Sequence, residues 1–151
     1  MGQRRKAREC ALQILFQLEF NSGDPKTLVK GYWEHQKVSS QVREFGTWIV
    51  ERILADGEEI DRTIQSASKN WRLARMAVVD RNILRIAVAE LLYERTLDPA
   101  IVMNEAIEIA KRYSGEESAV FVNGVLDAVG RVLGKAAGRA GRSGKEDEHE
   151  P

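Results

Sequence analysis

The chain of 151 residues is 43% hydrophobic and 30% charged, which is enough apolar material for one domain with a buried core. Its 23 basic and 23 acidic residues cancel, so binding to nucleic acid would have to come from a local patch. A single cysteine excludes an internal disulfide and favours the cytoplasm. We expect no membrane segment and no secretory signal, because no long apolar run exists. We also expect no metal or cofactor, because His35 and His149 stand apart without a ligand motif.

Every strong hydrophobic periodicity is helical, and no alternating run rich in β-branched residues predicts a strand. The sequence therefore predicts an all-α fold, a compact bundle of about seven helices. The lack of a repeat with a period of about 20 to 50 residues argues against a solenoid. The expected helices, in chain order, cover about 4–20, a segment after Asp24-Pro25, 40–55, 58–69, 79–95, a segment that opens at Asp98-Pro99 and ends near Gly115, and a last one that begins near Ser114 or Ser118.

The first turn of the first helix is basic, with Arg4, Arg5, Lys6 and Arg8 before the first acid at Glu9. Cations at a helix N-terminus oppose the helix dipole, so the cluster calls for compensation. RNA phosphates would supply that compensation, which makes the turn a candidate nucleic-acid contact. The alternative is a functionless cluster, because basic residues are common at frayed helix ends.

The first helix also carries two stripes at helical spacing. One is apolar and predicts ordinary core: Ala7, Cys10, Ala11, Ile14, Leu15 and Leu18. The opposite stripe contains Arg5, Glu9, Leu12, Phe16 and Phe20. A central helix that packs on both sides would bury Leu12 and Phe20, whereas Phe16 is a candidate exposed aromatic for stacking on a base or a partner.

The last helix contains Asn123 and Gly124, a pair typical of hairpin turns, within clear helical periodicity. A glycine inside a helix costs about 1 kcal/mol relative to alanine, so its presence needs a reason. Glu117, Phe121, Gly124 and Ala128 form a stripe at the edge of the core face. The glycine would let another backbone come close, either that of a neighbouring helix or that of an external partner.

The C-terminal segment differs in composition from the rest of the chain. From Gly134 onward it is rich in glycine, basic at first and then acidic. Such a segment buries little apolar surface. We therefore expect a helical domain over residues 1–134 and a disordered charged tail over residues 135–151.

Three segments of the chain resemble the NusB family of bacterial transcription antitermination factors. They are RRKARECALQILFQLEF, VVDRNILRIAVAELLY and NEAIEIAKRYSGEESAVFVNGVLD. The resemblance spans about residues 4–133 and is weakest over residues 22–70. It implies two small helical bundles and a role without catalysis. Family members pair with the small-subunit ribosomal protein NusE, bind boxA RNA in nascent, mainly ribosomal RNA transcripts, and work with other antitermination factors and RNA polymerase.

The resemblance also implies functional residues. Glu90 matches an acidic position at the NusE interface, and Gly124 lies on the stripe that could meet a partner. Relatives often carry an aromatic where this chain has Ala89, and some have tyrosine at Phe16. Asn123 is a candidate reader of base edges from its own chemistry. The full set of candidate RNA-binding residues is Arg4, Arg5, Lys6, Arg8, Phe16, Glu117, Phe121 and Asn123.

Other functions stay open at this point. One is a standalone NusB-like domain in ribosomal RNA processing, and another is a helical adaptor that binds proteins but no RNA. Similar domains also precede ribosomal RNA methyltransferases, but no Gly-rich nucleotide loop follows a strand here. An enzyme is least favoured, because no nucleophile–base grouping is evident. A homodimer also stays open, since some relatives self-associate.

Overall fold

The computed structural model describes residues 2–149, with side chains described to residue 134. Within that range the chain forms six α-helices, one short 3₁₀ helix and no strand, which confirms the all-α prediction. The helices are α1 (Gly2–Phe20), α2 (Pro25–Glu34), α3 (Ser40–Ala67), the 3₁₀ helix η1 (Leu73–Arg75), α4 (Val78–Tyr93), α5 (Pro99–Tyr113) and α6 (Glu116–His149). None of the described helices combines the length and the apolar character that a membrane crossing needs.

The helix count is six because α3 joins two helices that the sequence separates at Asp56. Asp56 has non-helical dihedral angles (φ −116°, ψ 27°), so the expected break is present as a kink. The helix resumes because both halves have apolar faces that pack on the same core, through Ile49 and Ile53 before the kink and through Ile60 and Ile64 after it.

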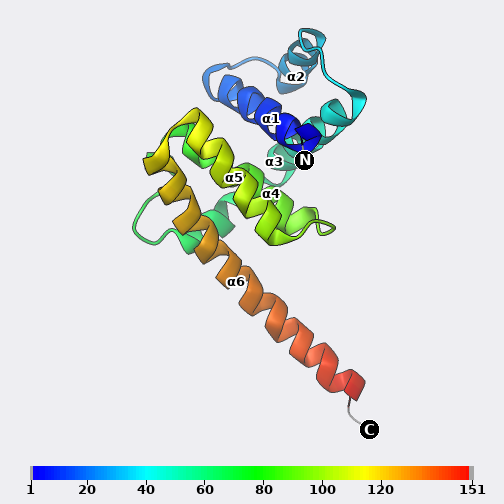
Figure 1. Cartoon of the computed structure of the whole chain (residues 1–151), viewed down its shortest axis with the longest axis vertical. Coiled ribbons are helices and arrows are strands. Elements are labelled where there is room, and N and C mark those ends of the chain that lie inside the picture. The colour runs from blue at the N-terminus through cyan, green and yellow to red at the C-terminus, as the bar shows by residue number, and fades with distance from the viewer. Residues whose placement is uncertain (1, 150–151) are drawn as a thin grey trace.

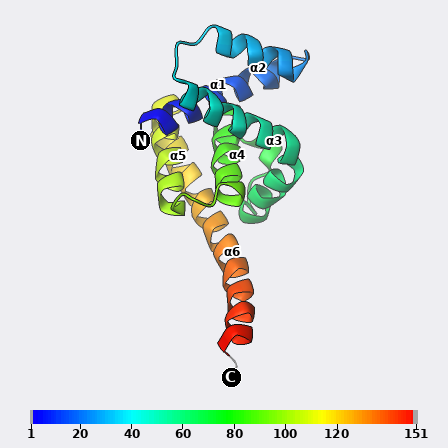
Figure 2. The same ribbon diagram turned by 90° about the vertical axis from the view of Figure 1, so that its right-hand side faces the viewer.

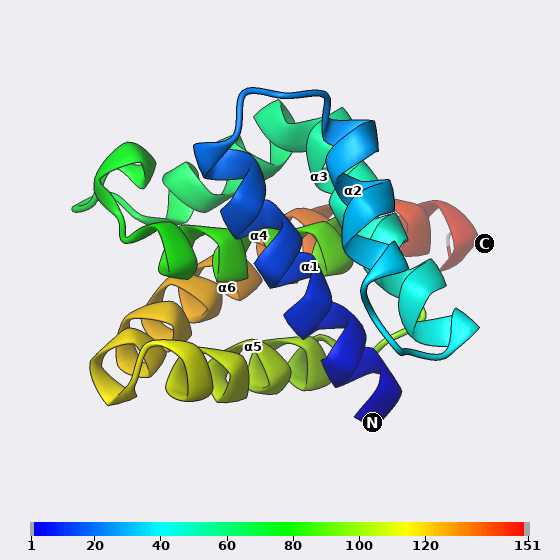
Figure 3. The same cartoon turned by 90° about the horizontal axis from the view of Figure 1, so that it is seen from above.

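The helices form two small groups that share α3 and α4 (Figures 1 and 2). α1 packs on α3 and α4, and α2 covers α1 on its outer side. α5 and α6 pair with each other and with α4, while α6 continues past the bundle as a long helix (Figure 2). Seen from above, α1 crosses the bundle and α5 runs along one side of it (Figure 3). α4 is therefore the central element.

Sequence signals at the helix ends agree with the structure. Asp24 and Asp98 cap α2 and α5, and each accepts a hydrogen bond from a backbone N–H at the start of its helix. Gly115 separates α5 from α6 with φ 107°, a conformation that favours glycine. Ser118 is not the cap, because α6 already begins at Glu116 and the Ser118 hydroxyl lies 3.3 Å from Asp80 Oδ2.

The expected apolar stripe of α1 is core, with Leu18 partly buried at its end. The second stripe is split. Leu12 is buried, so α1 does pack on two sides in its first half, but Phe20 is 67% exposed and its predicted burial is wrong. Close packing of α1 and α2 on α3 depends on Gly46, where a Cβ would lie 2.8 Å from the Trp33 ring of α2 and 3.3 Å from the Ala7 carbonyl oxygen of α1.

The predicted tail begins where the described side chains end. α6 is assigned as far as His149, but side chains from residue 135 onward lie outside the described part of the chain. The disorder expected for residues 135–151 therefore stays a prediction.

Candidate nucleic-acid interface

Arg8 and Glu90 form a buried ion pair between α1 and α4. Arg8 Nε donates to Glu90 Oε2 at 2.8 Å, and Nη2 donates to Oε1 at 2.7 Å, a bidentate geometry. Arg8 is 2% and Glu90 1% exposed. Burial raises the pKa of Glu90, and the hydrogen bonds from Arg8 oppose that rise. The sequence suggested Arg8 as an RNA contact and Glu90 as a partner contact. The structure corrects both positions, because neither side chain is exposed on the surface of this chain.

A second buried acid, Glu105 of α5, extends this ion pair. Arg5 Nε lies 3.2 Å from both Glu105 carboxylate oxygens, and Arg8 Nη1 lies 3.5 Å from Oε1. Two carboxylates from other helices, Glu90 and Glu105, therefore neutralise the charges of Arg5 and Arg8 from within the chain. The compensation that the helix dipole calls for does not depend on RNA phosphates alone.

Three basic side chains of this turn still reach solvent. Arg5 keeps 43% of its side chain exposed beside Glu105, and Lys6 is exposed. Arg4 lies over the Phe45 ring, 4.5 Å from its centroid, with Glu94 at 4.0 Å. We name Arg4, Arg5 and Lys6 the basic turn.

Beside the basic turn lies an open hollow of about 440 Å³. Two of its walls are the stacked rings of Phe45 and Trp48, with centroids 5.9 Å apart and planes 5° apart. Sequence reasoning missed this pair. The sequence does contain a signal for it: Phe45 and Trp48 are three positions apart on one expected helix, a spacing at which side chains are neighbours.

The edge stripe of α6 is open to solvent along much of its length. Glu117 and Gly124 are exposed, and Phe121 and Ala128 are half-buried. We name these four residues the α6 strip. Among the described residues, no atom outside the surrounding turns of α6 lies within 4 Å of the position that a Gly124 Cβ would take, so no described helix crosses α6 closely there. Of the two reasons given for Gly124, close approach by an external partner is the one left open.

Asn123, beside the strip, is exposed, so its amide can reach a ligand. Phe16 is 43% exposed and packs against Phe20 with ring centroids 5.0 Å apart. Three residues before Phe16, Gln13 Nε2 lies 3.4 Å from the Tyr113 hydroxyl at the end of α5. Phe16 therefore lies on the part of α1 that points toward the α5–α6 turn.

Phe121 has a neighbour that sequence reasoning missed. The ring of Trp71, in the loop after α3, meets it edge to face with centroids 6.2 Å apart and planes 83° apart. Trp71 is 59% exposed. The available signal was the stretch 62–79, which holds four basic residues, no acid and this tryptophan.

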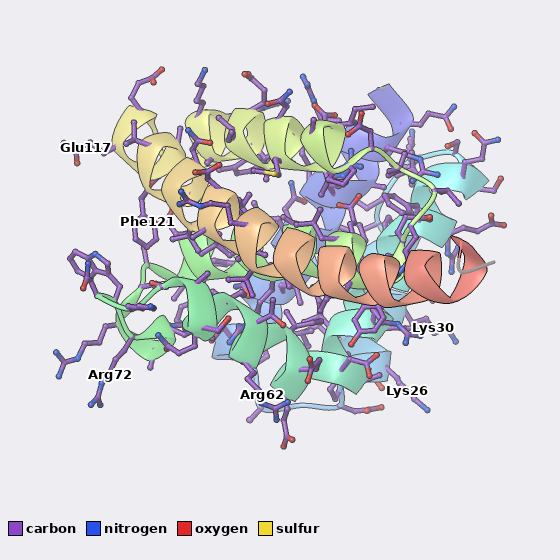
Figure 4. The ribbon with its side chains drawn as sticks, turned by 90° about the horizontal axis from the view of Figure 1, so that it is seen from below. Lys26, Lys30, Arg62, Arg72, Glu117 and Phe121 are labelled. Carbon is purple, nitrogen blue, oxygen red and sulfur yellow. The ribbon has the colours of Figure 1, made fainter. Side chains whose placement is uncertain are left out.

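The candidate residues thus form two groups. The N-terminus of α1 and the start of α6 lie toward opposite ends of α5 (Figure 3). Glu117 and Phe121 lie at the same end of the bundle as Arg72, away from Lys26 and Lys30 (Figure 4). α1 runs from the middle of α5, where Arg5 contacts Glu105, toward the C-terminal end of α5, where Gln13 approaches Tyr113. An extended ligand could touch both groups.

The described residues hold no group of three or more side chains that could bind a metal ion. Cys10 is buried, and His35 is exposed with its ring Nδ1 2.9 Å from the Gly31 carbonyl oxygen.

A model of the NusB family matches residues 5–131. The chain belongs to the NusB family. It is 43% identical over 127 residues to the transcription antitermination protein NusB of Trichlorobacter lovleyi, covering 84% of this chain and 89% of that one. It is 41% identical over 135 residues to the NusB of Sorangium cellulosum, covering 89% and 96%.

Solved NusB structures have the same fold. NusB of T. maritima superimposes with a TM-score of 0.76 at 36% identity, covering 85% of this chain and 90% of that one. A chain in the crystal structure of antitermination factors NusB and NusE in complex with dsRNA gives a TM-score of 0.78 at 29% identity, covering 87% and 98%. The NusB resemblance drawn from the three sequence segments is confirmed.

Proposed function

We propose that this NusB-family protein is a bacterial transcription antitermination factor that pairs with NusE and binds boxA RNA in nascent, mainly ribosomal RNA transcripts. The observation that carries the proposal is the similarity, over most of both chains, to a chain crystallised with NusE and dsRNA. The exposed basic and aromatic groups at both ends of α1 supply the contacts that single-stranded RNA needs.

In this proposal the basic turn attracts phosphates, which position the RNA but carry little sequence information. Phe16 and Phe121 stack on bases, and Asn123 and Glu117 hydrogen-bond base edges. A carboxylate accepts from amino groups, so Glu117 would favour bases that present one.

Arg8 and Glu90 act indirectly. Their buried pair, together with Glu105, fixes the first turns of α1 against α4 and α5. That fixation orients the exposed basic turn before RNA arrives and lowers the entropy cost of binding. Both residues are therefore positioning residues in this account.

A protein of zero formal charge has little overall electrostatic attraction for RNA. Pairing with NusE adds RNA contacts to those of this chain. A partner that presents further RNA contacts turns two weak sites into one tighter site. The open α6 strip at Gly124 is the proposed approach for a partner backbone. The protein acts by binding, without catalysis, in the cytoplasm, and meets RNA polymerase and the other antitermination factors through this complex.

Light scattering of the purified chain, alone and after addition of NusE, tests the pairing. We expect a mass that equals the sum of one chain and one NusE. A homodimer that NusE does not dissociate, or two separate monomers, would contradict the proposed pairing. A protein adaptor that pairs with NusE but leaves labelled boxA RNA unbound would replace the RNA-binding part of the proposal.

A further inference from the structure

We infer that Trp71, together with Phe121, forms a stacking site for an unpaired base of RNA, and that Lys69 and Arg72 hold the adjoining phosphates. The inference rests on the proposed function and adds to it a loop outside α1 and α6. Trp71 is 59% exposed, a large aromatic surface left in water. An exposed indole beside cationic side chains is the chemistry by which proteins bind single-stranded nucleic acid.

The loop that carries Trp71 is held in place by side-chain hydrogen bonds. Gln65 Nε2 donates to the carbonyl oxygens of Ser68 at 3.0 Å and of Trp71 at 2.9 Å. Ser68 Oγ donates to the Trp71 carbonyl at 3.1 Å, and Leu73 N donates to Gln65 Oε1 at 2.9 Å. The exposed indole therefore sits on a fixed backbone, which lowers the entropy cost of binding a ligand.

Two further anchors fix the other side of the loop. Leu73 and Met76 are buried in the core. Arg81 of α4 donates from Nη1 to the carbonyl oxygens of Ala74 and Met76 at 3.3 and 3.4 Å. Within residues 68–76, Trp71 is the one large apolar side chain that is exposed, so the exposure of the indole is built into the fold.

The contact with Phe121 connects the loop to the α6 strip. The edge-to-face arrangement of the two rings, at 6.2 Å, supports the indole from one side. Since Phe121 is itself half-buried on α6, the pair forms one continuous aromatic surface between two elements. A base stacked on this surface would lie at the same end of the bundle as Glu117 (Figure 4).

The charges favour RNA over a protein as the occupant. Residues 62–79 include four basic residues and no acid. Lys69 and Arg72 line an open hollow of about 840 Å³ with Arg81 and Arg85. Arg81 and Arg85 pair with acids in the same hollow, whereas Lys69 and Arg72 have no ion-pair partner among the described residues. Two cations without an ion-pair partner, both within two residues of the exposed indole along the chain, match a phosphate–base unit.

Fluorescence anisotropy of labelled boxA RNA, with NusE present, compares the unmodified chain with Trp71→Ala and Trp71→Phe. We expect Trp71→Ala to raise Kd about fivefold or more, and Trp71→Phe to raise it less, because a base still stacks on phenyl. The control is Leu54→Ala, which removes another exposed apolar side chain and leaves Kd unchanged. Lys69→Gln with Arg72→Gln should reduce the salt slope by about 1.4, or 0.7 for each phosphate contact.

A measurement on the unmodified chain does not depend on how the variants fold. Ultraviolet crosslinking to boxA RNA carrying 5-iodouridine, read by mass spectrometry, should mark the peptide with Trp71. An unchanged Kd for folded Trp71→Ala, or no crosslink to that peptide, overturns the inference and leaves the proposed function standing. Weaker NusE binding by Trp71→Ala in the absence of RNA assigns the indole to a protein contact and also overturns it. No RNA binding by the unmodified chain overturns both.

Discussion

The bidentate pair of Arg8 with Glu90 spans 82 positions of the chain and is almost wholly buried. It joins the first turns of α1 to the central helix α4, and Glu105 of α5 stands beside it. A buried charge without its partner is far more costly than the pair itself. The position of the basic turn therefore depends on an acid that comes from another helix.

Glu90→Gln should lower the free energy of unfolding by about 3 kcal/mol, because the buried Arg8 would lose its bidentate countercharge and keep only the longer contact with Glu105. Urea denaturation of the variant and the unmodified chain measures this difference. The control is Glu94→Gln, which removes the partly exposed partner of Arg4 and should cost about 1 kcal/mol or less. Equal losses for the two variants would contradict the structural role of the buried pair.

Glu19 makes stability depend on pH. Hydrogen bonds from Arg81 hold the pKa of this carboxyl below its usual value in the folded state. A lowered folded pKa gives stability that is present above the unfolded pKa and is lost as the pH falls through the folded pKa. Glu19→Gln should thus be less stable than the unmodified chain at neutral pH, by about 1 kcal/mol or less. The gap should close below about pH 4.5, and unfolding curves with a constant gap across acid pH would exclude this contribution.

Gly124→Ala separates helix propensity from binding. Since nothing outside the local helix lies within 4 Å of the added methyl group, the substitution should stabilise α6 by about 0.5–1 kcal/mol. Its affinity for NusE or RNA should fall, because a methyl group would hinder the close approach. Thermal unfolding and a binding titration on the same sample give both values. A more stable variant with unchanged affinity for both ligands would mean that the glycine has no part in binding.

The basic turn is tested by Arg4→Gln combined with Lys6→Gln. Arg4 would lose its contacts with Phe45 and Glu94, both only partly buried, so the melting temperature should fall by about a few degrees at most while RNA binding weakens. The slope of log K against log salt should become shallower by about 1.4 for two lost phosphate contacts on single-stranded RNA. Lys26→Gln combined with Lys30→Gln, on α2, is a matched removal of two exposed basic charges outside this turn. A slope that does not change in the double variant would remove the turn from the RNA site.

The helices themselves were predictable from the sequence, since their signals are local. Asp24-Pro25 and Asp98-Pro99 mark helix starts, and both are used. The break expected at Asp56 is a kink, because the apolar face continues on both sides of it and packing overrides the local signal.

The site was only partly predictable, since its partners come from distant segments. Phe16, Glu117 and Asn123 are exposed as expected from helical spacing. Nothing within α1 indicates that Glu90 and Glu105 reach Arg8 from two other helices, so its burial could not be inferred. Trp71 belongs to a loop without periodicity, and its contact with Phe121 exists only after α3 and α6 pack.

Sequence-selective binding of boxA RNA together with NusE is tested most directly by fluorescence anisotropy at one fixed salt concentration. The quantity to measure is the Kd for a scrambled RNA divided by the Kd for boxA RNA, with NusE present. We expect tighter binding to boxA, by about tenfold or more, because hydrogen bonds to base edges from Asn123 and Glu117 distinguish the two RNAs and about 1.4 kcal/mol of such discrimination is tenfold in Kd. We also expect this Kd ratio to fall toward one when NusE is left out. A ratio of one with NusE present would contradict the central claim and leave a basic turn that binds RNA without reading its sequence.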